Sequence, residues 1–292
     1  MSAVTAPRDS TLGEKAAATR RHWWAILLWL VVGFFFVNLL LLVASVIVDS
    51  LGTRWFDTWL PQGFTIHWYA DAWHDFGLSS VMLVTLEVAL AVIVLSILIG
   101  VPASYALARR EFPGKKLVMV LFVLPILVPP ITYGIPLATV LYKVHLAGTM
   151  PGVIVANLVP SVPFVILTMT PFIEQIDPKI EAAARMCGAK TVSVFTHILA
   201  PLLVPGILAA CILVMVRTVG MFELTFLTAG PDSTTLVVAL YNAVFAAGIR
   251  ANQSVDAMAA MYTGSMLVLL VVALRFVNPT QLVGRGAEEV SR

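Results

Sequence analysis

Six long runs of apolar residues limit how this chain can fold. They cover residues 24–48, 80–107, 117–141, 152–173, 199–222 and 257–277. A bilayer core about 30 Å thick needs about 20 apolar residues per helix, and the backbone polar groups inside it must be bonded within the protein. The runs are too long and too uniformly apolar for alternating barrel strands. With 60% hydrophobic and 12% charged residues, the chain is predicted to be an all-α integral membrane protein with six transmembrane helices.

The chain ends are predicted to be tails. Residues 1–22 are small, polar and basic, and the apolar run that follows is too long for a signal-peptide core. We therefore expect a disordered tail over 1–22, an uncleaved signal anchor, a transmembrane domain over 23–278, and a second tail over 279–292. A seventh apolar stretch, 235–248, is too short to span comfortably and is predicted to be a re-entrant or interfacial helix.

Basic residues predict the orientation of the spans. Of the 18 lysines and arginines, fourteen fall in the N-terminal tail and the segments on its side of the membrane, and three fall on the other side: Arg54, Lys143 and Arg250. Because positively charged loops remain in the cytoplasm, both termini and the loop 174–198 are predicted to be cytoplasmic. The net charge of only +2 gives no reason to expect a nucleic acid partner.

The loop 174–198 is polar and predicts a short helix. Asp177 suits an N-cap, Pro178 suits the first helical position, and Glu181 suits the helix dipole. Gly188 suits the left-handed residue that ends a helix. Ala182–Ala184 combine high helix propensity with little bulk, so another protein surface can approach closely. A docking helix and an amphipathic helix on the inner leaflet are both open interpretations.

The same loop resembles the cytoplasmic EAA loop of permease subunits in type I, binding-protein-dependent ABC importers. The resemblance rests on the spacing of Glu181, Ala182, Ala183, Gly188, Phe195, Ile198, Pro201 and Pro205. The stretches GVPASYALARREFPGKK and VLPILVPPITYGIPL are similar to the spermidine/putrescine-type branch. That branch usually has a serine-phenylalanine-aspartate-glutamate run after the fifth span, whereas GMFELTFLTAG keeps only Phe222 and Glu223 of it.

The resemblance implies the six-helix, MetI-like permease fold, in a bacterial inner membrane. Its ATPase-coupling loop would contain Glu181, Ala182, Ala183, Arg185, Gly188, Phe195 and Pro201. The implied partners are two copies of an ABC ATPase subunit that act on ATP and Mg, a second permease of a different chain, and an extracytoplasmic solute-binding protein. The implied solute is small and polar, such as a polyamine; a sugar, an amino-acid derivative, iron or another anion is the alternative.

Nucleotide chemistry is expected to reside in a partner. No G-x-x-x-x-G-K-[ST] phosphate loop occurs in this sequence. Cys187 and Cys211 lack the neighbours expected of a metal site. The chain is therefore expected to bind no cofactor or metal and to be a transport subunit rather than an enzyme. A self-sufficient secondary transporter would show internal repeats, and a membrane enzyme would show a nucleophile paired with a base; neither pattern is found.

Charged residues within the spans mark a candidate translocation pathway. Glu87 lies in the second span, and Arg217, Phe222 and Glu223 lie near the end of the fifth. Charges at membrane depth usually face a cavity or a partner. If Gly220 breaks the helix, Arg217 and Glu223 can come together; Glu223 would then attract a cationic solute and Arg217 would tune it. A structural ion pair or snorkelling to the interface is the alternative.

The third apolar run is unusually rich in proline. Its prolines are Pro125, Pro129, Pro130 and Pro136. Kinked helices are tolerated where protein or a water-filled cavity covers the freed carbonyls. The prolines therefore favour a bent span that faces the pathway, with a bent lipid-facing helix as the alternative.

Overall fold

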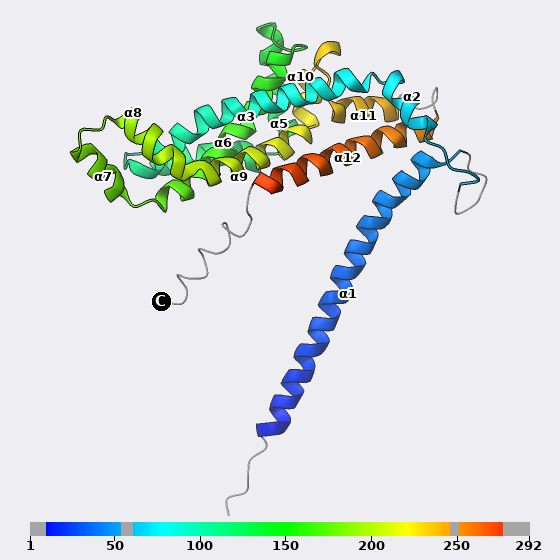
Figure 1. Ribbon diagram of the computed structural model, residues 1–292, viewed down its shortest axis with the longest axis horizontal. Coiled ribbons are helices and arrows are strands. Elements are labelled where there is room, and N and C mark those ends of the chain that lie inside the picture. The colour runs from blue at the N-terminus through cyan, green and yellow to red at the C-terminus, as the bar shows by residue number, and fades with distance from the viewer. Residues whose placement is uncertain (1–9, 54–60, 246–250, 277–292) are drawn as a thin grey trace, which may run out of the picture. The chain divides into compact units, whose positions relative to one another are not determined.

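The computed structural model describes residues 10–53, 61–245 and 251–276. Within these residues the regular structure is helical, apart from one isolated β-bridge between Gly52 and Phe64. The chain divides into two compact units, residues 1–65 and 66–292. Figure 1 shows the helices of both units, most of them labelled.

The first unit consists mainly of the helix α1, Ser10–Leu51. Its part Trp23–Leu51 is long and apolar enough to cross a membrane. The helix begins at Ser10, inside the segment 1–22 that was expected to be disordered. The alanines at 16–18 have high helix propensity, which explains why the helix extends backward from the apolar run. The remainder of that predicted tail, residues 1–9, lies outside the described residues.

Three helices form the main core of the second unit: α3 (Leu78–Arg109), α6 (Met150–Glu174) and α9 (Ala200–Val219). They run side by side in Figure 1. A methyl group added at Gly100 on α3 would lie 2.6 Å from Cγ1 of Val165 on α6, and one added at Gly206 on α9 would lie 3.0 Å from the Phe172 ring. Helices in lipid associate through close packing at such small residues. The glycines thus allow the three helices to approach closely.

The predicted span 117–141 is divided into two helices, α4 (Lys115–Leu127) and α5 (Pro130–Lys143), which meet at an angle of 99°. Proline removes a backbone donor and forces the preceding residue into an extended conformation. Val128 and Pro129 are accordingly extended, with ψ angles of 132° and 133°. Five helices of the described residues are long and apolar enough to cross a membrane, and the bent pair makes a sixth if it is one span.

Two short helices, α7 (Pro178–Met186) and α8 (Thr191–Val194), lie at the end of the second unit where α3 terminates. We call this the Arg109 end. A π-helical turn, Phe195–Leu199, joins α8 to α9. The long apolar helix therefore begins at Thr191, earlier than the predicted residue 199, because the turn lets the chain stay helical past the polar loop.

The opposite end of the second unit, which we call the Leu78 end, contains several short elements. They are α2 (His67–Asp75), α11 (Leu236–Phe245) and the start of α12 (Asn252–Phe276), whose buried residues pack with Leu78. Two other short elements, α10 (Glu223–Thr228) and a 3₁₀ turn (Pro231–Ser233), lie beside α5 and α6 instead. The backbone N–H of Leu236 donates to Oγ1 of Thr85 at 2.8 Å, which ties α11 to α3. With ten residues, α11 is short for a span, so its interfacial location stays a prediction.

Gly100→Ala is expected to destabilise the packing of α3 against α6. The new methyl group would overlap Val165, whose branched side chain is stiff in a helix. Overpacking costs about 1–3 kcal/mol, so the Tm of the purified protein in detergent should fall, and the double variant Gly100→Ala/Val165→Ala should recover most of the loss. Gly264→Ala is the control, because no atom lies within 4 Å of its added methyl. An unchanged Tm for Gly100→Ala would contradict this packing.

Candidate functional site

The helix α7 has the start and the end that the sequence predicts. The carboxylate of Asp177 accepts from the backbone N–H of Lys179 at 2.9 Å, and Pro178 is the first helical residue. Gly188 has a φ of +88°, and Ala189 N–H donates to the carbonyl of Ala184 at 3.1 Å. This left-handed glycine with a bond back into the last turn is a Schellman motif. Local sequence alone therefore delimits α7.

Glu181 of α7 points into the protein rather than away from it. Its side chain is only 5% exposed. Oε1 accepts from Nε of Arg109 at 2.7 Å, and Oε2 accepts from the hydroxyl of Tyr105, also at 2.7 Å. Both donors belong to the last turns of α3, four residues apart and hence on one helix face. The carboxylate therefore ties α7 to the end of α3.

Two further contacts complete this group. Nη2 of Arg109 donates to the carbonyl of Ile176, just after α6, at 2.7 Å. Nη2 of the half-exposed Arg185 donates to the Tyr105 hydroxyl at 3.2 Å and lies 3.6 Å from Oε2 of Glu181. We call Tyr105, Arg109, Glu181 and Arg185 the Glu181 cluster. Two cations thus neutralise one buried carboxylate, whose desolvation would otherwise be costly.

The opposite face of α7 is exposed and largely apolar. Ile180 is 45% exposed and Met186 is 84% exposed, and Ala182 and Ala183 are exposed beside them. Val192 of the following helix α8 is also exposed, at 74%. We call these five residues the α7 apolar face. A polar side turned inward and a small, apolar side turned outward suit a helix that another surface covers.

The other predicted loop residues take different positions. Phe195, in the π-helical turn, is half-buried, and its ring meets the Tyr105 ring edge-on at 5.7 Å. Pro201 is exposed in the first turn of α9. π-Helical turns are often found at functional sites. Phe195 therefore belongs with the Glu181 cluster, whereas Pro201 only helps the start of α9.

The helix break predicted at Gly220 is present, beside α5 and α6. α9 ends at Val219, and α10 starts at Glu223. No ion pair joins Glu223 to Arg217 in the part of the chain that the structure describes. Instead, Cζ of Arg217 lies 5.8 Å from the centroid of the Phe164 ring, a cation–π distance. Nε of Arg217 is buried and has no hydrogen-bond partner among the described residues.

Aromatic residues that the sequence did not single out surround this break. The hydroxyl of Tyr133, on α5, is buried and unpartnered among the described residues, and it interacts electrostatically with Arg217 and Glu223. The Phe222 ring stacks on the Phe226 ring with 5.1 Å between the centroids, and its centroid lies 4.7 Å from that of the Tyr241 ring on α11. Only the tertiary fold brings α5, α9, α10 and α11 together, so no local signal marked Tyr133 or Tyr241.

Glu87 lies apart from this group. It is exposed on α3, and no described contact joins it to Arg217, Phe222 or Glu223. Its neighbours Leu83, Leu86 and Leu90 are also exposed, at 59%, 44% and 50%. A carboxylate on such an apolar face is costly in lipid. This face of α3 therefore needs water or another protein beside Glu87.

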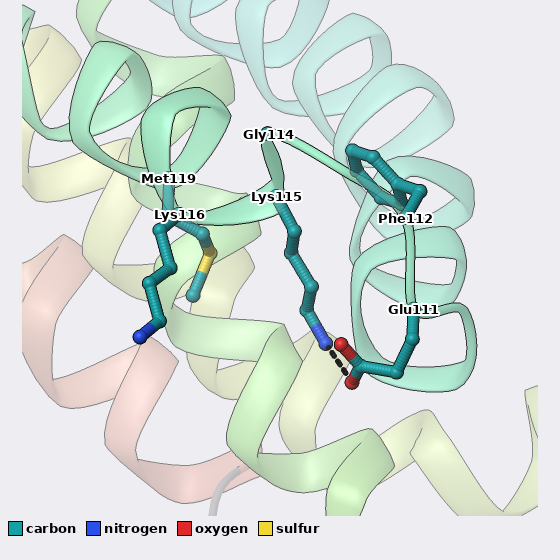
Figure 2. A pocket seen from close by; sticks show the side chains of 6 residues that line it. All are labelled: Glu111, Phe112, Gly114, Lys115, Lys116 and Met119. Carbon is teal, nitrogen blue, oxygen red and sulfur yellow. Dashed lines mark hydrogen bonds and ion pairs between the residues drawn. The ribbon is translucent and has the colours of Figure 1, made fainter.

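An open hollow of about 630 Å³ lies where α3 turns into α4 (Figure 2). It is lined by Glu111, Phe112, Gly114, Lys115, Lys116 and Met119. Nζ of Lys115 is 2.8 Å from Oε1 of Glu111, as the dashed line in Figure 2 marks. Four of the lining residues are exposed and the other two half-exposed, so the hollow contains no buried polar group that selects a ligand.

Comparison with known proteins gives a family match and several relatives. The profile of the binding-protein-dependent transport system inner membrane component matches residues 96–279. The trehalose transport system permease protein SugB of Mycobacterium tuberculosis is 31% identical over 184 residues, which are 63% of this chain and 67% of that protein. The molybdate/tungstate permease protein WtpB of Thermococcus kodakarensis is 31% identical over 55% of this chain and 65% of that protein. The sulfate permease protein CysW of a Synechocystis species is 26% identical, over 56% and 63%.

Among solved structures, a chain of a bacterial ABC transporter for the import of the acidic polysaccharide alginate has a similar fold. The TM-score is 0.72, with 16% identity over 94% of this chain and all of that chain. A second structure of an alginate transporter, in complex with its periplasmic protein bound to an alginate pentasaccharide, gives a TM-score of 0.66. At this identity the likeness concerns the fold alone. The matched segments of WtpB and CysW amount to less than two thirds of the length of those two relatives.

Asp177→Ala is expected to weaken the first turn of α7. The change removes the carboxylate that accepts from Lys179 N–H, and loss of an N-cap costs about 1 kcal/mol. Amide hydrogen exchange at residues 179–182 should therefore become about fivefold faster. Asp177→Asn keeps an acceptor and is the control. Equal exchange rates in the two variants would contradict the capping role.

Proposed function

This chain belongs to the family of binding-protein-dependent transport system inner membrane components, and we propose that it forms half of the translocation pathway of an ATP-driven ABC importer. The family and its relatives are transport permeases, so the chain is a transport subunit and not an enzyme. The observation that carries the proposal is the position of α7 inside the matched region, with its apolar face exposed and its carboxylate buried.

The proposed complex divides the work between subunits. Two copies of an ABC ATPase subunit hydrolyse ATP with Mg, and one of them binds this chain at the Arg109 end. A second permease, of a different chain, completes the pathway in the bacterial inner membrane. A solute-binding protein delivers the solute at the Leu78 end. The alginate transporter structure with a bound periplasmic protein supports this arrangement by analogy of fold.

The α7 apolar face is the proposed contact with the ATPase. Its two alanines let a cleft of the partner approach the backbone, and Ile180 and Met186 supply apolar area to bury. Gly188 ends the helix, so the chain turns back toward α8 directly beyond this face. Glu181, on the buried side of α7, holds the helix in place through its bonds to α3. Phe195 and Arg185 support Tyr105 in the same group.

Arg217, Phe222 and Glu223 are the proposed pathway residues, and the structure adds Tyr133 to them. The break between α9 and α10 places polar groups beside aromatic rings, where an incoming solute finds both donors and an acceptor. Glu87 also remains a proposed pathway residue. Its exposed position on an apolar face of α3 suits a site beside the second permease.

The solute is proposed to be small and polar. The branch resemblance favours a polyamine, whose positive charges would be attracted by Glu223. The relatives described above are named for trehalose, molybdate or tungstate, and sulfate, and none of these three is named for a polyamine. A sugar or an oxyanion is therefore an equal candidate, and Nε of Arg217, which has no hydrogen-bond partner among the described residues, is a donor of the kind that such a solute would need.

Met186→Asp is expected to weaken the association with the ATPase. The change places a charge at a position of α7 that is 84% exposed, and an interface that buries such a position should lose about 2 kcal/mol or more. Less ATPase should co-purify with the permease, although the permease still inserts. Gln175→Glu adds the same charge at an exposed position outside the α7 apolar face and should leave co-purification unchanged. Full recovery of the ATPase with Met186→Asp would contradict the proposed contact.

Glu223→Gln is expected to slow uptake by the reconstituted transporter by about tenfold, because a charged hydrogen bond to the solute contributes about 1.5–3 kcal/mol. Arg217→Gln should instead leave uptake of a cationic solute intact and reduce uptake of an anionic one. Asp232→Asn changes an exposed acid nearby and is the control. Wild-type uptake by both variants, with every solute tested, would exclude this part of the proposed pathway.

A further inference from the structure

We propose that Arg109 and Tyr105 are positioning residues that link the movement of α7 to α3, through the buried carboxylate of Glu181. This inference rests on the proposed docking of α7 to an ATPase subunit. It concerns how a displacement of α7 reaches the transmembrane helices, and it assigns that role to side chains of α3.

The first step of the argument is the geometry of Arg109. Its guanidinium donates from Nε to Glu181 on α7 and from Nη2 to the carbonyl of Ile176 after α6, each at 2.7 Å. The planar fork of arginine can hold two acceptors in fixed directions, whereas a lysine ammonium holds them as a point charge. One side chain of α3 thus determines both where the loop leaves α6 and where α7 lies.

The second step is burial. The side chains of Glu181 and Arg109 are 5% and 13% exposed. Separation of such a pair leaves a charge without a partner in a poorly hydrated place, and this is strongly unfavourable. The connections on both sides of α7 are irregular, so without this pair α7 could change its orientation relative to α3. Because the pair opposes that motion, α7 and the end of α3 move together.

The third step is what α3 contacts. Tyr105 meets Phe195 edge-on at 5.7 Å, and Phe195 lies in the π-helical turn that leads into α9. Farther from the Arg109 end, Gly100 of α3 is in close contact with Val165 of α6. α3 itself runs from the Arg109 end to the Leu78 end. A displacement of α7 is therefore passed to α3 directly, and to α6 and α9 by contact.

The test uses the complete transporter in proteoliposomes, with ATPase activity measured with and without the solute-loaded binding protein. Arg109→Gln and Glu181→Gln should each reduce the stimulated activity by about tenfold, while the ATPase still co-purifies, because the α7 apolar face is unchanged. The double variant should be more active than either single variant, since it leaves no buried charge unpaired. Arg110→Gln removes the exposed charge directly after Arg109, at the end of α3, and should behave as wild type.

A second measurement needs no partner. With Cys211→Ser, a spin label on the exposed Cys187 reports the mobility of the end of α7 in the full-length chain. Arg109→Gln and the milder Tyr105→Phe should increase the mobility of this label, and Arg110→Gln should not.

The outcomes separate the two proposals. Additive losses in the double variant would show that Glu181 and Arg109 act independently. A label mobility equal to that of the wild-type chain, or wild-type stimulation of the ATPase, in Arg109→Gln would also overturn the inference. A wild-type chain that neither co-purifies with the ATPase nor stimulates it would instead refute the proposed function, while the label experiment would still decide whether Arg109 positions α7.

Discussion

The ion pair between Glu181 and Arg109 is the contact on which the Arg109 end of the molecule depends. It joins α7 to α3 over 72 residues of sequence, at 2.7 Å and with little access to water. Tyr105 and Arg185 complete the coordination of the carboxylate. Because Glu181 faces inward, the opposite side of α7 faces outward, with Ala182, Ala183 and Met186 beside the exposed Lys179. The orientation of the candidate docking surface is thus a consequence of electrostatics behind it.

The membrane imposes the second constraint, because freed backbone groups in lipid need a partner or water. Three departures from regular α-helix lie within or beside the apolar runs of the described residues and matter here: the Val128–Pro129 bend, the π-helical turn before α9, and the break after Val219. The first follows from proline chemistry. The second lets α8 and α9 remain one helix. The third places Arg217 on α9 and Glu223 on α10, and no ion pair joins the two among the described residues.

Local features of this sequence were predictable, and distant pairings were not. Asp177, Pro178 and Gly188 determine the start and end of α7 through bonds to residues within a few positions, so sequence reasoning located the helix. The long apolar runs likewise predicted the helical membrane fold. The inward direction of Glu181 was missed, because it depends on Arg109 and Tyr105, which reach it only in the folded chain. The 99° bend was visible as a proline cluster, but its angle depends on tertiary packing.

Two parts of the second unit, the Arg109 end and the α9–α10 break, differ in how completely their polar groups are satisfied, and this difference bears on function. At the Arg109 end, each oxygen of the Glu181 carboxylate has a donor from α3. Near the α9–α10 break, Nε of Arg217 and the hydroxyl of Tyr133 are buried without a hydrogen-bond partner among the described residues. Native proteins rarely leave such groups unpaired, so this part of the chain requires something that it does not itself supply. The proposed role as a subunit of a larger transporter would account for both findings: a docking end that is rigid before its partner binds, and a pathway whose polar groups are satisfied once a second permease and the solute are present.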